Sequence, residues 1–239
     1  MQGQVHKVDG QPAFVLHTYP FRETSLIVEA FARDFGRVAL MARGARRPRS
    51  ALRGVLMAFQ PLEISWAGKG EIKTIIKAEW QGGQPLLSGR ALFCGYYLNE
   101  LLLVLLPRED PHARLFSVYA ETLRRFADGP KESDIRLFER AFLQELGYGL
   151  TLKHDEQGRP IDQARYYAYE IERGPVCLRE DDEAALAISG KTLIDLYAGD
   201  LSDPRSLLEA KQLMRTLIAH YLGGKGLETR KIFLELQEP

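Results

Sequence analysis

Cysteine, histidine and long apolar runs are scarce in this sequence of 239 residues. Its two cysteines, Cys94 and Cys177, are too few for the disulfide framework of a small secreted protein, so free thiols in a reducing cytoplasm are expected. The longest apolar stretch, 101–106, is far shorter than the roughly 20 residues that cross a bilayer. No basic-then-apolar segment opens the sequence, so we expect neither a signal peptide nor contact with a membrane.

Motifs for catalysis and metal binding are missing as well. The five histidines are scattered without metal-ligand spacing, and no CxxC occurs. Ser189-Gly190-Lys191-Thr192 resembles the end of a phosphate-binding loop, but Ala185 stands where such a loop needs its first glycine. We therefore expect no enzyme, no cofactor and no metal site.

The net charge of zero hides an uneven distribution of charge. Residues 1–80 carry twelve Lys and Arg against seven Asp and Glu, a charge of +5, whereas residues 81–239 carry −5. A basic front half followed by an acidic back half indicates two modules with different partners.

The first eighty residues have the composition of short β-strands. Strands are predicted over 13–18, 25–31, 37–43, 61–66 and 71–80. Five or six short strands in about eighty residues are typical of a small barrel.

Helical spacing of apolar residues begins after residue 85. We predict helices over 90–106 and 112–126, a third that starts at a Ser133 or Asp134 N-cap and ends before Gly147, and a fourth with Asp203 as N-cap, Pro204 at its first position and its end at 223–224. The predicted fold is therefore α+β. A β-barrel domain spans residues 1–80, and a mainly α-helical domain spans 81–239, with a short irregular or hairpin insertion around 150–180.

The segment from residue 36 to residue 62 is rich in arginine and has no acidic residue. Its arginines are Arg37, Arg43, Arg46, Arg47, Arg49 and Arg53. Four guanidinium groups within 43–50 cannot be buried without partners, so this loop is expected in solvent, where its positive field suits phosphates. A merely solvated loop is the alternative, but the absence of compensating acids favours nucleic-acid contact.

Aromatic residues near this surface are candidates for stacking on bases, because a basic barrel with a few exposed aromatics is a common way to bind single strands. They are Phe14, Tyr19, Phe21, Phe35, Phe59 and Trp66. Most aromatics of a small barrel belong to its core, and the sequence does not choose among the six.

A series of short motifs, in order along the chain, resembles the RecO family of bacterial DNA repair proteins. The first are Phe21-Arg22-Glu23-Thr24-Ser25, Phe35-Gly36 and the segment 42–48. Further matches lie at 99–102, 109–112, 138–139, 146–148 and 222–223, so the resemblance spans nearly the whole chain.

This resemblance implies an N-terminal oligonucleotide/oligosaccharide-binding (OB) fold and a recombination mediator. Such a protein binds single- and double-stranded DNA, anneals complementary strands and helps to load RecA together with RecR and single-strand-binding protein. It would act in the cytoplasm, associated with the nucleoid. DNA binding is then expected from Arg37, Arg43, Arg46, Arg47, Arg49, Arg53 and Lys73.

The resemblance also implies that the later half of the chain binds the acidic C-terminal tail of single-strand-binding protein. The candidate residues are Arg136, Arg124 and Arg140, with Arg125 and Arg230 beside them. The alternative is an adaptor that docks on single-strand-binding protein and makes only incidental DNA contact. A nuclease or hydrolase is a further alternative, and no motif supports it.

One departure from the family concerns zinc. Some RecO proteins carry a four-cysteine zinc site in the region that corresponds to 150–178, where this chain has only Cys177 and His154. Because a structural zinc site needs four ligands, zinc is not expected. Packing around the tyrosines at 166, 167 and 169 is expected to hold this region instead.

Overall fold

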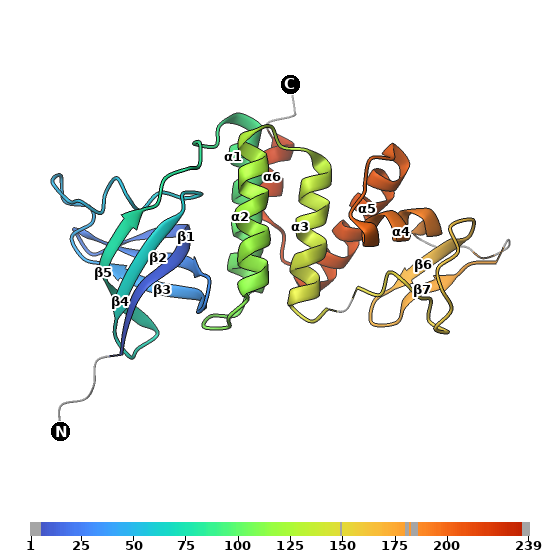
Figure 1. Ribbon diagram of the computed structural model, residues 1–239, viewed down its shortest axis with the longest axis horizontal. Helices are drawn as coiled ribbons and strands as arrows, with labels where there is room; N and C mark the ends of the chain where they lie inside the picture. Colours follow the sequence, from blue (N-terminus) through green and yellow to red (C-terminus); the bar gives the residue numbers. More distant parts are fainter. Residues whose placement is uncertain (1–5, 149, 180–181, 183–185, 236–239) are drawn as a thin grey trace. The chain divides into compact units, whose positions relative to one another are not determined.

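The computed structural model describes residues 6–148, 150–179, 182 and 186–235. Its N-terminal strands are β1 (Lys7–Phe21), β2 (Ser25–Ala32), β3 (Gly36–Ala42), β4 (Leu62–Ala67) and β5 (Ile72–Trp80). They form a closed barrel in the order β1-β2-β3-β5-β4, in which β3 and β5 run parallel and the other neighbours antiparallel (Figure 1). This five-stranded barrel is OB-like, which confirms the predicted α+β class.

Alternating side chains fill the barrel because successive residues of a strand point to opposite faces. The core includes Val28 and Ala30 of β2, Leu40 of β3 and Ile64 of β4. Trp66 of β4 is 1% exposed, and Phe35 packs edge-on against it with ring centroids 5.2 Å apart. Both rings therefore serve the core.

Two helices pack with the barrel, α1 (Gly89–Leu105) and α2 (Ala113–Ala127). Phe14 of β1 and Phe31 of β2 lie against Phe116 and Tyr119 of α2, with ring centroids 5.2 to 6.0 Å apart. Aromatic pairs at these distances and tilted geometries stabilise the contact beyond the burial of their area. The outer wall of the barrel and the helices thus share one apolar layer.

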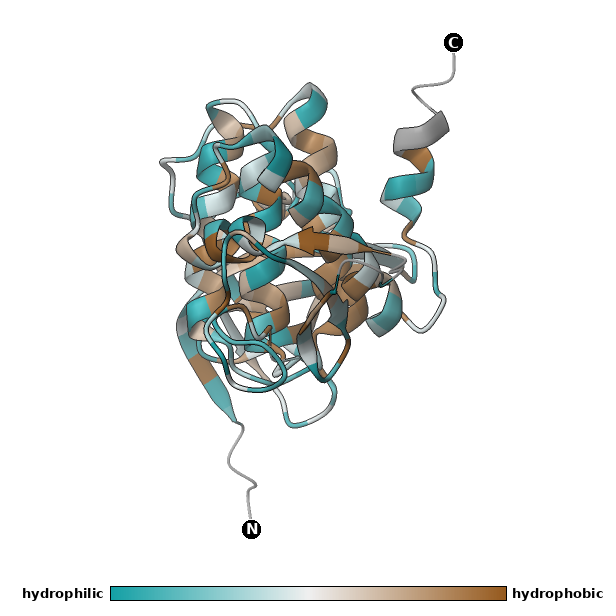
Figure 2. Ribbon diagram, turned by 90° about the vertical axis from the view of Figure 1, so that its right-hand side faces the viewer, coloured by the Kyte–Doolittle hydropathy of each residue, from teal (hydrophilic) through white to brown (hydrophobic). Residues whose placement is uncertain are grey.

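The rest of the chain forms helices and a small sheet. The elements are α3 (Glu132–Glu145), β6 (Tyr166–Glu170), β7 (Gly174–Cys177), β8 (Ala187–Ser189), α4 (Gly190–Ala198), α5 (Pro204–Tyr221) and α6 (Glu228–Glu235), and the three strands pair in the order β7-β6-β8. Several helices carry both hydrophilic and hydrophobic residues along their length, as expected for helices with one buried face (Figure 2).

Contacts divide the chain into two compact units. The first unit holds residues 1–130 and 227–239, and the second holds 131–226. The first unit thus contains the barrel together with α1, α2 and α6. The domain boundary predicted at residue 80 coincides with the end of β5 and lies inside this unit. No helix within the described residues is long and apolar enough to cross a membrane.

The helix starts show where local sequence signals succeed and where they fail. Asp203 caps α5, and its carboxylate accepts hydrogen bonds from the N–H groups of Arg205 and Ser206 at 2.8 and 3.1 Å. The predicted N-cap of α3 was wrong, since Lys131 occupies that position. Asp134 instead lies in the first turn of the helix. Its carboxylate accepts the N–H of Lys131 at 3.2 Å, so a residue within the helix supplies the acceptor for this terminal N–H.

Candidate nucleic-acid interface

The chain between β3 and β4, residues 43–61, forms an extended loop that we call the arginine loop. It carries five exposed arginines, Arg43, Arg46, Arg47, Arg49 and Arg53. Successive turns shape its backbone, with hydrogen bonds from Arg47 N–H to Gly44 O and from Ser50 N–H to Arg47 O, both 3.0 Å long. Ala45 and Leu56 are buried in the barrel core and anchor the loop while its arginines face solvent.

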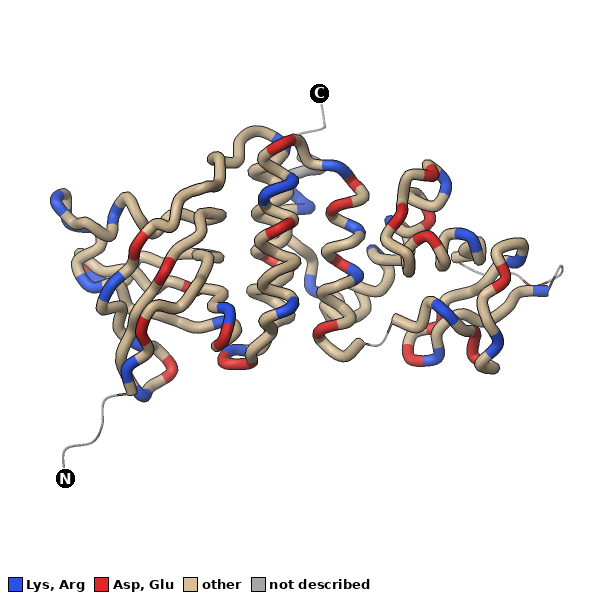
Figure 3. Tube along the Cα trace, viewed as in Figure 1, with Lys and Arg blue, Asp and Glu red and all other residues tan. Residues whose placement is uncertain are grey.

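These five arginines are not neutralised by nearby acids. Across the part of the chain that the structure describes, none of the five has a carboxylate oxygen within 4.0 Å. Figure 3 shows basic positions on this loop. Uncompensated guanidinium groups on one loop create a local positive field that attracts phosphates.

The turn between β1 and β2 brings a further arginine to the same end of the barrel. The Arg46 N–H donates to Thr24 O at 2.9 Å, and the Arg46 guanidinium donates to Arg22 O at 3.3 Å. Arg22 is exposed, and its guanidinium lies 5.3 Å from the centre of the Phe21 ring. Sequence reasoning missed Arg22 because its proximity depends on the pairing of β2 with β3 (Leu26 opposite Ala42).

Two of the predicted DNA-binding residues lie elsewhere. Arg37 stands at the start of β3 and Lys73 at the start of β5, and these strands are parallel. The arginine loop leaves β3 at its other end, ~20 Å along the strand at 3.3 Å per residue. This length of strand separates Arg37 from the other five, whereas Lys73 lies opposite Leu40, close to the point where the loop leaves β3.

Both residues also have acidic partners. Arg37 lies 3.6 Å from Glu29, a carboxylate with a side chain 3% exposed, and Arg108 bonds to the same carboxylate. Burial lowers the pKa of Arg37, and the charge of Glu29 opposes that shift. Lys73 pairs with Glu109, which also donates its N–H to Arg37 O at 2.9 Å. These contacts attach the segment that follows α1 to the barrel, so both cations have structural roles.

The six aromatic candidates differ in how far their rings are exposed. Phe14, Phe59 and Trp66 are buried, and Phe35 is partly buried against Trp66. Phe21 is partly exposed and Tyr19 is 46% exposed. Trp80, which was not among the six, is 58% exposed at the end of β5. Its place at the edge of the predicted β-segment is the signal that could have pointed to it.

Comparison with known proteins decides the family. Residues 9–83 match the family described as "Recombination protein O N terminal", and residues 86–231 match "Recombination protein O C terminal". The chain belongs to the RecO family. The resemblance inferred from the motifs is therefore confirmed.

Individual relatives cover nearly the whole chain. The DNA repair protein RecO of Dechloromonas aromatica (strain RCB) is 66% identical over 97% of this chain and 98% of the relative. The protein of the same name from Aromatoleum aromaticum (strain DSM 19018 / LMG 30748 / EbN1) is 56% identical over 98% and 99%. A solved structure of Entamoeba histolytica asparaginyl-tRNA synthetase aligns with 76% of this chain and with 41% of the synthetase chain, at 13% identity. The TM-score of 0.27 is too low to indicate a shared fold.

The arginines considered for binding a protein partner are largely engaged within their own units. Arg136 pairs with the buried carboxylate of Glu139 at 3.0 Å. Arg140 donates to the carbonyls of Leu196 and, at 2.8 Å, Tyr197, where it satisfies the C-terminal end of α4. Arg124 is exposed on α2 and pairs with Glu121, as does Arg125.

In the region 150–178, the carboxylate of Asp155 closes a turn. Asp155 accepts hydrogen bonds from Gln157 N–H and Arg159 N–H, both at 2.9 Å, and from the Arg159 guanidinium at 2.7 Å. Among the described residues, no group of three or more His, Cys, Asp or Glu is placed to hold a metal ion. The bonds to Asp155 all lie within residues 155–159, so they fix a local turn.

The Ser189–Thr192 segment is a capped helix start. The Glu209 carboxylate accepts the Ser189 N–H at 2.8 Å and the Thr192 hydroxyl at 2.7 Å. A Cβ at Gly190 would lie 1.9 Å from Asp162 O, so only glycine fits there. The carboxylate stands where a phosphate-binding helix start would need open space, which agrees with the sequence argument against such a loop.

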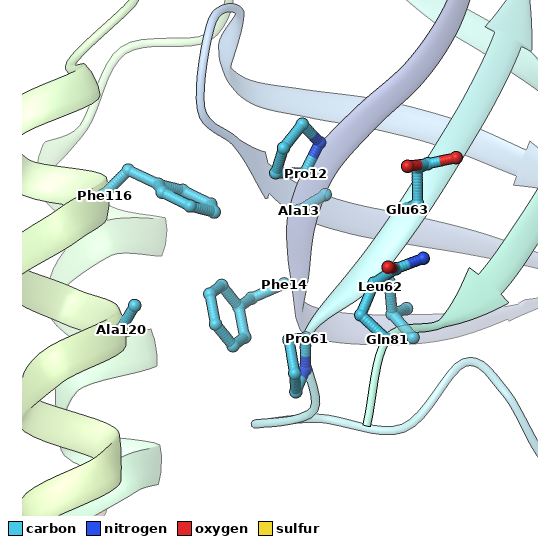
Figure 4. A pocket seen from close by; sticks show the side chains of 9 residues that line it. All are labelled: Pro12, Ala13, Phe14, Pro61, Leu62, Glu63, Gln81, Phe116 and Ala120. Carbon is cyan, nitrogen blue, oxygen red and sulfur yellow. The ribbon is translucent and has the colours of Figure 1, made fainter. Parts of the chain in front are cut away.

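An apolar hollow of about 260 Å³ lies beside β1, β4 and α2 (Figure 4). Pro12, Phe14, Pro61 and Phe116 are among the residues that line it, and Glu63 is its charged member. The hollow is smaller than most small-molecule sites and has no set of converging polar groups. It therefore gives no reason to expect a bound cofactor.

Proposed function

We propose that the arginine loop binds single- and double-stranded DNA and that this binding underlies a role as a recombination mediator. The observation that carries the proposal is the set of five exposed arginines with no carboxylate within 4.0 Å in the described structure. Membership of a family whose relatives are named DNA repair proteins supports it. The protein would act in the cytoplasm, at the nucleoid.

Annealing requires no bond chemistry on this view. Two complementary strands repel each other through their phosphates, and an arginine-rich surface lowers that repulsion by displacing bound counterions. The same surface holds both strands at a high local concentration. Together with RecR and single-strand-binding protein, such a protein would assist the loading of RecA.

Docking on the acidic tail of single-strand-binding protein is part of the proposal, and RecR binding is proposed without an assigned surface. Among the three arginines predicted for the tail, Arg124 is the exposed one, since Arg136 is buried and Arg140 caps α4. Arg124→Glu is therefore the variant to test, with weaker binding of a tail peptide as the expected result.

The DNA proposal is tested by substituting Arg46, Arg47 and Arg49 together with alanine. Affinity for a labelled oligonucleotide should fall, and the slope of log affinity against log salt should shrink by about 2 for a single strand, at about 0.7 per phosphate contact. The matched control replaces three exposed cations of the second unit, Lys211, Arg215 and Lys225, for the same change in net charge. Equal affinities and slopes in both folded triple variants would refute the assignment and favour the adaptor function.

A further inference from the structure

The barrel is closed over only part of the length of β5. Strand β3 pairs with β5 at Ala39–Ile72, Leu40–Lys73 and Met41–Thr74, and it ends at Ala42. Strand β5 continues to Trp80, paired along this stretch only with β4, as far as Leu62 opposite Trp80. Within the described strands, the second edge of β5 beyond Thr74 therefore has no partner.

The two ends of the arginine loop lie near the two ends of this open edge. The loop begins where β3 stops, beside the middle of β5, and it returns to the sheet next to Trp80. There the Gln81 N–H donates to Pro61 O at 2.9 Å, and the Trp80 indole N–H donates to Gln60 Oε1 at 3.1 Å. Strand pairing thus places the uncompensated arginines and the exposed indole on one loop–strand unit.

Trp80 has the properties of a fixed stacking platform. Its ring is 58% exposed, yet its N–H is held by Gln60, a residue that is itself buried. A ring that is already oriented loses little conformational freedom when a flat partner covers it. Ile76, four residues earlier on the open stretch of β5, is also exposed.

We propose that Trp80 stacks on an unpaired base of a single strand whose phosphates lie along the arginine loop. The inference rests on the proposed DNA-binding function and adds a preference to it. Within a duplex the bases are already stacked on each other and only the terminal pairs expose a face, so a single strand offers the indole far more free base faces. The arginines bind the phosphates of both single- and double-stranded DNA, whereas Trp80 contacts single strands.

The test compares a single-stranded oligonucleotide with a blunt duplex of the same sequence and length, using the full chain. Trp80→Ala should weaken single-strand binding roughly 5- to 100-fold and leave duplex binding within about twofold. Tyr197→Ala, which removes a comparably exposed ring from the second unit, serves as the matched control and should change neither. Equal losses for both DNA forms in Trp80→Ala would overturn the stacking role.

Tryptophan fluorescence gives a second readout because the chain has two tryptophans and Trp66 is buried. Single strands should quench the wild-type emission. Trp80→Phe retains a ring and should retain most of the affinity, but the quenching should vanish. Tight single-strand binding by Trp80→Ala, without quenching in the wild type, overturns the stacking role and leaves the proposed function intact. Failure of the wild type to bind either DNA form overturns both.

Discussion

Asn99 shows how a single buried polar residue fixes the packing of the first unit. Its side-chain N–H donates to Leu16 O in β1 at 2.8 Å, and its oxygen accepts the Tyr119 hydroxyl of α2 at 2.5 Å. One amide on α1 therefore links a strand and a second helix. Burial raises the pKa of Tyr119, which keeps its hydroxyl a donor at every physiological pH.

Replacing Asn99 with leucine should lower the free energy of unfolding of the first unit by about 2–6 kcal/mol. The change removes the hydrogen bonds of Asn99 to the Leu16 carbonyl and to the Tyr119 hydroxyl in a buried site, and each such loss costs about 1–3 kcal/mol. Urea unfolding followed by tryptophan emission measures the effect, since both tryptophans lie in the first unit. Arg90→Ala, at an exposed position on the same helix, should stay within about 0.5 kcal/mol. A leucine variant as stable as the wild type would contradict the proposed role of the amide.

At this scale the sequence reveals where charge is concentrated but not which charges are paired. The arginines of 43–53 are exposed as predicted, because several guanidinium groups close together in sequence cannot be buried without acidic partners. Arg37 and Lys73 look equally basic in the sequence. Their partners, Glu29 and Glu109, come from another strand and from the segment after α1, so only the folded chain reveals these pairs.

Helix α4 is an element that depends on a distant cap. The Glu209 carboxylate of α5 accepts the N–H of the N-cap Ser189 and the Thr192 hydroxyl, and Arg205 donates to its other oxygen at 2.8 Å. The Ser189 hydroxyl accepts the Thr192 N–H in the first turn. Burial raises the pKa of Glu209, but hydrogen bonds from Thr192, Ser189 and Arg205 outweigh it, so the pKa lies below its ordinary value. Helix α4 and the carboxylate thus stabilise each other.

The pH dependence of the second unit follows from that lowered pKa. A carboxylate with a lower pKa in the folded state contributes its full stability above the unfolded-state pKa of about 4.3 and loses it as the pH falls through the folded value. Glu209→Gln should therefore cost about 1–3 kcal/mol at pH 7, and the difference from the wild type should shrink below about pH 4.

Thermal unfolding across a pH series, followed by circular dichroism, tests this prediction. Glu71→Gln, an exposed carboxylate of the first unit, provides the background pH dependence. A stability difference between wild type and Glu209→Gln that stays constant from pH 7 to pH 3 would show that the charge of Glu209 does not act through the cap.

Elements with strong local signals were the ones predicted from the sequence. Asp203-Pro204 marks the start of α5, and β-rich segments mark the barrel strands. Helices α4 and α6 and strand β8 were not predicted, because they are short and their stabilising groups are far away in sequence. The N-cap of α3 was misplaced because Lys131 has no capping side chain, and the acidic residue that satisfies the terminus lies inside the helix.

At the scale of the whole molecule, the chain returns to its first unit after completing the second. Helix α6 belongs to the first unit, and its first turn is bound by Glu100 of α1. The Glu100 carboxylate accepts the N–H groups of Glu228 and Thr229 at 2.6 and 2.9 Å. A negative charge at a helix N-terminus also interacts favourably with the helix dipole. Periodicity in the sequence cannot reveal this closure, since 128 residues separate the partners.

Glu100→Ala should release α6 without disturbing the second unit. The substitution removes the side-chain acceptors of two backbone N–H groups and the favourable charge, so amide hydrogens of α6 should exchange markedly faster, by roughly tenfold for a loss of about 1.4 kcal/mol. Exchange measured by mass spectrometry on peptides from 228–235 reports this directly, while peptides from α3 and α5 should keep their wild-type rates. Glu121→Ala, which removes a carboxylate from the exposed side of α2, is the control and should leave α6 unchanged. Unchanged α6 exchange in Glu100→Ala would mean that apolar packing alone, and not this carboxylate, attaches the C-terminal helix to α1.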